Sequence, residues 1–186
     1  MEQNNPLRIK LIIGLGNPGK KYKNTWHNTG FIFLDKLKEK LEYQFHEVNK
    51  KEYELTTFPT LKLKLLKPLT FMNNSGSVVA DYLKNSPVEP KNILIVHDDL
   101  DLSLGKFKLQ FNKFPKVHNG INSIHEKTDR KNYNYLRFGI ETRNRLAKLR
   151  TSGSDYVLLS MKKGESEQMN DVISQGIKQL TEVLIK

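Results

Sequence analysis

The spacing of hydrophobic positions changes several times along the chain, and each spacing predicts an element. Apolar runs in Leu7–Ile13 and Asn92–Val96 predict buried strands. Strict alternation in Thr60–Leu66 and Lys106–Phe111 predicts strands with one exposed face. Two further segments are interpreted as strands, Glu52–Phe58 and Tyr135–Ile140. Apolar residues three and four positions apart predict helices over Phe31–Tyr43, Ser77–Leu83, Asn122–Asp129 and Glu165–Lys186.

These strands and helices are interleaved, which defines the expected fold class. Continuous and alternating strands occur together, so the sheet should contain both parallel and antiparallel pairs. The chain has 186 residues without linker composition or internal repeats, close to the roughly 150 residues of one typical domain. We therefore expect an α/β fold in a single domain over residues 1–186, with a twisted mixed β-sheet and helices on both faces.

The distribution of charge narrows the range of partners. The chain carries 31 Lys and Arg against 20 Asp and Glu, a net charge of +11. Residues 105–150 hold twelve of the positive charges and three negative ones, and residues 1–30 hold five against one. Such blocks favour a polyanion such as nucleic acid as the partner. Solubility alone is the alternative explanation of a basic composition.

Composition also excludes several classes of protein. The absence of cysteine excludes disulfide frameworks, thiolate zinc sites and cysteine nucleophiles. No apolar stretch approaches the ~20 residues of a membrane span, and residues 1–6 lack the apolar segment of a secretory signal. We therefore expect a cytoplasmic protein without membrane contact.

A glycine-rich loop follows the first predicted strand. Gly14–Gly19 matches the dinucleotide-binding pattern G-x-G-x-x-G. That pattern requires a helix to begin at once, however, whereas Pro18 removes an N–H donor and residues 20–24 have no apolar helical face. A glycine turn shaped for backbone reasons is the more common explanation, and these glycines could also place Asn17 at the lip of a cleft.

A histidine and a carboxylate are the main candidates for chemistry. His27 lies in a polar loop and could act as a general base near neutral pH. Asp98 follows an apolar strand, at the edge where ligands bind in open α/β sheets, and could orient that histidine. The acidic run around it also permits a metal site or a solvated turn. In an extended segment His97, Asp99 and Asp101 would face one way and Asp98 the other.

Three loop asparagines could supply hydrogen bonds to a substrate. Asn17, Asn73 and Asn119 each offer amide donors and an acceptor that do not titrate, suited to a carbonyl, an oxyanion or a water. Each could equally be a turn residue. The chain lacks the G-x-S-x-G nucleophile pattern and the phosphate-binding G-x-x-x-x-G-K-[ST], so neither a serine nucleophile nor ATP hydrolysis has support.

Taken together, these segments resemble the bacterial-type peptidyl-tRNA hydrolase family. The resemblance is carried by four motifs in order: GLGNPGKKYKNTWHNTGF at residues 14–31, PLTFMNNSG at 68–76, VHDDLDLSLG at 96–105 and VHNG at 117–120. The R-x-G-I pattern of the strand ending at Ile140 also fits. The resemblance covers nearly the whole chain.

The resemblance implies a monomeric enzyme without metal or cofactor. It would hydrolyse the ester between a peptide, or an N-blocked aminoacyl group, and the 3′ ribose of tRNA, and so recycle tRNA. The alternative is a non-catalytic RNA-binding relative. By position, His27 matches the base, Asp98 its orienting acid and Asn17 the residue that selects N-blocked substrates. Substrate-contacting positions are matched by Tyr22, Phe71, Asn73 and Asn119, and the tRNA phosphate clamp by Lys106, Lys108 and Arg137.

The chain departs from the family pattern at two places. Trp26 replaces the arginine that usually precedes the histidine. The loop at residues 112–118 lacks the usual glycines and contains Phe114 and Pro115 instead. The second change should affect closure of this loop over the substrate rather than the chemistry. The segment at residues 141–150 is also more basic than the family pattern.

Overall fold

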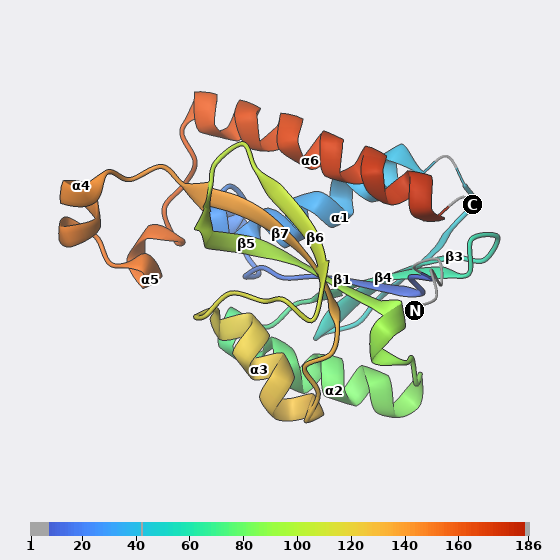
Figure 1. The fold of residues 1–186 in the computed structure, drawn as a ribbon. Helices are drawn as coiled ribbons and strands as arrows, with labels where there is room; N and C mark the ends of the chain where they lie inside the picture. Colours follow the sequence, from blue (N-terminus) through green and yellow to red (C-terminus); the bar gives the residue numbers. More distant parts are fainter. Residues whose placement is uncertain (1–7, 42, 185–186) are drawn as a thin grey trace, which may run out of the picture.

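A seven-stranded mixed sheet forms the centre of the molecule (Figure 1). The computed structural model describes residues 8–41 and 43–184. The strand order is β2-β3-β4-β1-β5-β7-β6, with β4, β1, β5 and β7 parallel and the outer pairs antiparallel. The strands are β1 (Leu11–Gly14), β2 (His46–Asn49), β3 (Tyr53–Phe58), β4 (Leu63–Pro68), β5 (Ile93–Ser103), β6 (Phe107–Phe111) and β7 (Asn134–Glu141).

Helices cover both faces of the sheet, as Figure 1 shows. One face carries α1 (Thr29–Lys40) and α6 (Lys163–Leu184), and the other carries α2 (Ser75–Asn85) and α3 (Asn119–Thr128). The shorter helical segments are η1 (Lys20–Tyr22), η2 (Trp26–Asn28), η3 (Met72–Asn74), η4 (Pro90–Asn92), α4 (Arg145–Arg150) and α5 (Gly153–Tyr156). No helix among the described residues is long and apolar enough to cross a bilayer.

Alternation along β5 divides the core between the two faces. Leu94 and Val96 pack against α1 and α6, whereas Ile93 and Ile95 pack against α2 and α3. Because both faces of this strand are buried, its sequence is a continuous apolar run. The predicted apolar stripe of α6 is buried against the sheet at Met169, Val172, Ile173, Ile177 and Leu180.

The expected fold class, a twisted mixed sheet with helices on both faces, is confirmed.

Several predicted element boundaries were wrong. Residues 97–103 belong to β5, because pairing with β7 continues beyond the apolar run. Residues 60–62 form a turn, with Lys62 at φ 51°, so β4 begins later and includes Lys67 and Pro68. Two elements, α4 and β2, were not predicted. Four positions within the predicted elements lie outside the described residues: Leu7 and residues 42, 185 and 186.

A close backbone contact holds the start of α1 against the sheet. A Cβ atom at Gly30 would lie 2.3 Å from the Leu15 backbone nitrogen and 2.4 Å from the Val96 carbonyl oxygen. Only glycine permits this approach, because those neighbours are backbone atoms and cannot rotate away. The contact brings the residues just before α1, including His27, to the carboxyl end of β1 and the middle of β5.

Candidate active site

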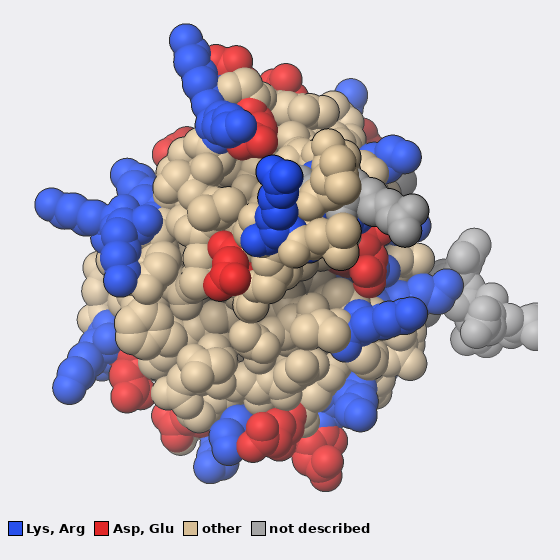
Figure 2. All heavy atoms as spheres, turned by 90° about the vertical axis from the view of Figure 1, so that its left-hand side faces the viewer, with Lys and Arg blue, Asp and Glu red and all other residues tan. Residues whose placement is uncertain are grey.

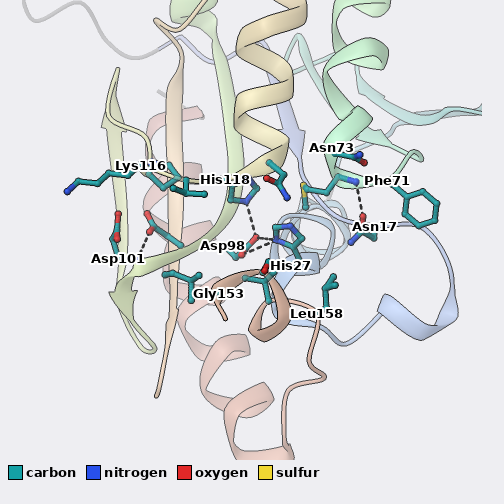
Figure 3. Close-up of a pocket in the computed structure, with 18 of the residues that line it drawn as sticks. Asn17, His27, Phe71, Asn73, Asp98, Asp101, Lys116, His118, Gly153 and Leu158 are labelled. Carbon is teal, nitrogen blue, oxygen red and sulfur yellow. Dashed lines mark hydrogen bonds and ion pairs between the residues drawn. The ribbon is translucent and has the colours of Figure 1, made fainter. Parts of the chain in front are cut away.

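A pocket of about 920 Å³ opens beyond the carboxyl end of β1 and along the later part of β5 (Figure 3). Its walls come from loops far apart in the chain. Seven of the residues proposed from sequence line it: Asn17, Tyr22, His27, Phe71, Asn73, Asp98 and Asn119. The structure thus gathers residues of four separate motifs around one cavity.

His27 and Asp98 meet within this pocket. His27 lies in η2, and Asp98 lies in β5 on the face toward α1. The Nδ1 atom of His27 is 2.9 Å from Oδ1 and 3.1 Å from Oδ2 of Asp98. Because a carboxylate only accepts hydrogen bonds, Nδ1 carries the proton. The Nε2 atom is then left with its lone pair, which is the arrangement a general base requires.

The electrostatics of the pair keep Asp98 ionised. Burial raises the pKa of Asp98, but the facing His27 and His118 outweigh it and hold that pKa well below its ordinary value. Burial lowers the pKa of His27. The charge of Asp98 and the hydrogen bond to Asp98 raise that pKa by more, so it lies above the ordinary value of 6.5. The carboxylate therefore favours the protonated form of the His27 imidazole.

His118 is a member of the site that the sequence analysis missed. It precedes α3 and caps it, since its Nδ1 accepts the backbone N–H of Ile121 at 3.3 Å. Its Nε2 must then donate, and it lies 3.1 Å from Asp98 Oδ1. The sequence signal was present, because His118 stands directly before Asn119 in the VHNG motif, but nothing local shows that this imidazole reaches Asp98.

Asn17 is oriented by backbone groups. Its Oδ1 accepts the N–H of Met72 at 2.8 Å, so its amide nitrogen is the group left to donate. Its own N–H and carbonyl are held by the Asn28 side chain at 2.8 and 2.9 Å. With 5% of its surface exposed, Asn17 is a fixed donor in the pocket wall. The interpretation that the glycine loop places Asn17 at a cleft matches the observed geometry.

The three residues assigned to a phosphate clamp lie outside the pocket lining. Lys106 is exposed directly before β6, and Lys108 is exposed within it. Arg137, on β7, donates from Nε to Asp99 Oδ2 at 2.6 Å and from Nη1 to Gln110 at 3.1 Å. Asp99 is buried, so the charge of Arg137 is compensated within the protein. The count of positive charges in residues 105–150 therefore includes Arg137, which is already paired with an acidic residue.

The loop at residues 112–118 forms one wall of the pocket. Pro115, Lys116 and Val117 line the cavity. Phe114 is not among the lining residues and packs against His125, with ring centroids 4.6 Å apart. Glycines in this loop would provide neither the aromatic contact nor the apolar wall, so the departure from the family pattern gives the pocket a bulkier edge.

Two alternative interpretations of the motifs can be compared with the geometry. The glycine loop is followed by the three-residue η1 and not by a long helix, so the dinucleotide-binding arrangement is not formed. As expected for an extended segment, His97 and Asp99 face away from Asp98: Asp99 pairs with Arg137, and His97 packs against Tyr135. Among the described residues, His27, Asp98 and His118 are the group close enough to share a metal ion. Here hydrogen bonds already join them.

The fold and the site together define an α/β protein with a hydrogen-bonded histidine–carboxylate pair at an open pocket. Comparison with known proteins shows the family to which it belongs. The family model described as peptidyl-tRNA hydrolase matches residues 11–186. The peptidyl-tRNA hydrolase of Neisseria meningitidis serogroup A is 36% identical over 181 residues, covering 95% of this chain and 91% of that protein. That of Sulfurihydrogenibium sp. is also 36% identical, over 176 residues with the same coverage.

A solved structure agrees with these relatives. The crystal structure of peptidyl-tRNA hydrolase from Acinetobacter baumannii superimposes with a TM-score of 0.83 at 30% identity, covering 97% of this chain and 91% of that one. This chain belongs to the peptidyl-tRNA hydrolase family.

Proposed function

We propose that this chain hydrolyses the ester that joins a peptide, or an N-blocked aminoacyl group, to the 3′ ribose of tRNA. The observation that carries the proposal is the His27–Asp98 pair, 2.9 Å apart at an open pocket, in a chain that belongs to the peptidyl-tRNA hydrolase family. Recycling of tRNA from prematurely released peptidyl-tRNA is the role that follows from this activity.

His27 is the proposed general base. Its Nε2 takes a proton from a water molecule as the water oxygen attacks the ester carbonyl carbon. Asp98 holds the Nδ1 proton in place and stabilises the imidazolium ion. When the tetrahedral intermediate collapses, the bond to the ribose oxygen breaks and His27 returns its proton to that oxygen. An ester needs no covalent enzyme intermediate for this reaction.

Asparagine amides are the proposed donors to the substrate. Asn17 has its amide oxygen fixed on Met72, so its nitrogen can donate to the carbonyl oxygen on which negative charge develops. Asn73 and Asn119 line the same pocket and can hold the attacking water or the peptide. We assign Asn17 the further role of selecting N-blocked substrates.

Aromatic and basic side chains are the proposed tRNA contacts. Tyr22 and Phe71 meet edge to face at the pocket, 6.2 Å between centroids, and Phe71 is 58% exposed. Such rings offer stacking surfaces to an unpaired 3′ end. In Figure 2, Lys and Arg side chains stand around the periphery of the face that carries α4 and α5, and basic and acidic side chains also lie nearer its middle. Lys106 and Lys108 lie outside the pocket, where acceptor-stem phosphates can reach them.

We further propose that the chain acts as a cytoplasmic monomer of one domain, without metal or cofactor. All groups assigned to the reaction come from one chain. The Nδ1 and Nε2 protons of the two histidines already satisfy Asp98. Full activity in excess chelator, and a molar mass of one chain in solution, are the expected results.

Hydrolysis of N-acetyl-aminoacyl-tRNA by three proteins tests the proposed function. Wild type should release the acyl group, and His27→Ala should be slower by roughly 10²–10⁴-fold. His46→Ala is the matched control, because His46 is exposed on β2, at the opposite edge of the sheet from β6. It should behave as wild type. Binding of tRNA without cleavage by wild type would favour the RNA-binding relative, and equal rates for all three proteins would contradict the assignment of His27.

A further inference from the structure

We propose that Arg143 is a positioning residue for His27, acting through Tyr156 and Trp26, and not a contact for RNA. The inference rests on the proposed function, because it assigns Arg143 to the same reaction. Charge alone suggests the opposite role, since Arg143 lies in the most basic part of the chain, residues 105–150.

The guanidinium of Arg143 is already engaged. It donates from Nε to Glu141 Oε1 at 3.0 Å and from Nη2 to Oε2 at 2.8 Å, a two-point contact with one carboxylate. Its Nη1 donates to the carbonyl of Thr151 at 2.8 Å. The side chain is 10% exposed. Its charge is therefore compensated and its planar face covered, which leaves little for a phosphate group to bind.

An aromatic contact continues from this guanidinium into the core. The central carbon of the Arg143 guanidinium lies 4.2 Å from the centroid of the Tyr156 ring. The Tyr156 ring is stacked on Trp26, with centroids 5.8 Å apart and planes inclined by 20°. The Tyr156 hydroxyl donates to the carbonyl of Ile140 at 3.0 Å. Trp26 is 1% exposed, so the stack connects Arg143 to a buried residue directly before the proposed base.

Backbone hydrogen bonds join the same two segments around His27. The N–H of His27 donates to the carbonyl of Val157 at 2.8 Å, and the N–H of Trp26 donates to Leu159 at 3.3 Å. Val157 directly follows Tyr156 and lines the pocket. A displacement of this segment would therefore move the imidazole of His27 relative to Asp98 and to the bound ester. A misplacement of about 1 Å can cost on the order of 10²-fold in rate.

Two substitutions at Arg143 distinguish positioning from RNA binding. Arg143→Ala should lower kcat by about tenfold, while KM and its dependence on salt stay as in wild type. Arg143→Lys should not restore kcat, because an ammonium group cannot reproduce the planar fork and the stacking. If Arg143 contacted a phosphate, Arg143→Ala would instead raise KM and weaken the salt dependence of KM. Arg143→Lys would then have a KM close to that of wild type. That result would overturn the proposal.

Glu141→Gln provides a second test, because a positioning role and an RNA contact of Arg143 predict different kinetic changes for it. If Arg143 positions His27, weakening its carboxylate partner should lower kcat. If Arg143 contacts RNA, releasing its charge should lower KM, which would contradict the proposal. Arg150→Ala is the matched comparison, since Arg150 is exposed at the end of α4. It should raise KM in a salt-dependent way and leave kcat unchanged.

Trp26 is the only tryptophan of the chain, so its fluorescence reports on the stack independently of activity. Arg143→Ala and Arg143→Lys should increase quenching of Trp26 by acrylamide under conditions where circular dichroism shows a folded protein, and Arg150→Ala should not. Unchanged quenching in both Arg143 variants would overturn the proposal. If wild type cleaved no ester, the proposed function would fail, while the quenching data would still decide whether Arg143 holds the segment that carries His27.

Discussion

Replacing Asp98 by asparagine removes one charge from the site and leaves its shape nearly unchanged. Asp98 accepts two N–H donors, from His27 at 2.9 Å and from His118 at 3.1 Å. The side-chain oxygen of an asparagine can still accept both hydrogen bonds. Its amide nitrogen, however, takes the place of the second carboxylate oxygen, Oδ2, which lies 3.1 Å from Nδ1 of His27. That nitrogen is a donor and cannot accept the Nδ1 proton. The tautomer of His27 with the proton on Nδ1 is then no longer favoured.

The size of the effect follows from the charge that develops during the reaction. When His27 takes a proton, its positive charge faces the Asp98 carboxylate. For charge centres ~4 Å apart and an effective dielectric constant of ~20, that attraction is about 4 kcal/mol. At about 1.4 kcal/mol for each factor of ten, its loss corresponds to a fall in kcat of roughly 10³-fold.

The pH dependence of kcat/KM gives an independent measurement. Burial lowers the pKa of His27, but Asp98 raises it further, so the pKa lies above 6.5 in wild type. A base works deprotonated, and wild-type activity should therefore fall as the pH drops through a midpoint above 6.5. In Asp98→Asn only the effect of burial is left, and the midpoint should move to lower pH.

Hydrolysis of N-acetyl-aminoacyl-tRNA between pH 5 and 9 measures both quantities, with circular dichroism as the control for folding. A kcat for Asp98→Asn close to that of wild type would refute the role of the carboxylate. A midpoint that stays in place in the variant would refute the assignment of that pKa to His27.

Three further predictions follow from the geometry. Asn17→Asp retains the acceptor for Met72 but loses the donor, so kcat should fall by about 10²–10³-fold with the fold intact; a normal kcat would contradict this role. KM should rise with salt, and Lys108→Ala should lower the slope of log KM against log salt by about 1; an unchanged slope would exclude Lys108 as a phosphate contact. Gly30→Ala should destabilise the protein by about 1–3 kcal/mol or more in urea unfolding, because its Cβ would meet backbone atoms. Gly164→Ala, with open space around its Cβ, is the control and should be neutral or slightly stabilising.

The loop motifs identified the residues of the pocket more reliably than the charge did. His27, Asp98 and Asn17 were singled out because a histidine, a carboxylate and an amide have characteristic chemistry, and all three line one cavity. The charge count over residues 105–150 included Arg137 among the positive charges available to a polyanion, yet Arg137 is paired with the buried Asp99. Charge along a sequence does not reveal which cations have partners, since those partners come from other strands.

The sequence by itself determined the order of the central elements, because periodicity is a local property of ten or so residues. The apolar run ending at Val96 and the stripe of α6 were visible in this way. Only the tertiary structure decided where β5 ends, since residues 97–103 extend by pairing with β7 and not by their own apolar pattern. It alone brought His118 to Asp98 across 20 positions and His27 to Asp98 across 71. Such contacts depend on how the layers pack, and no local pattern of residues encodes that distance.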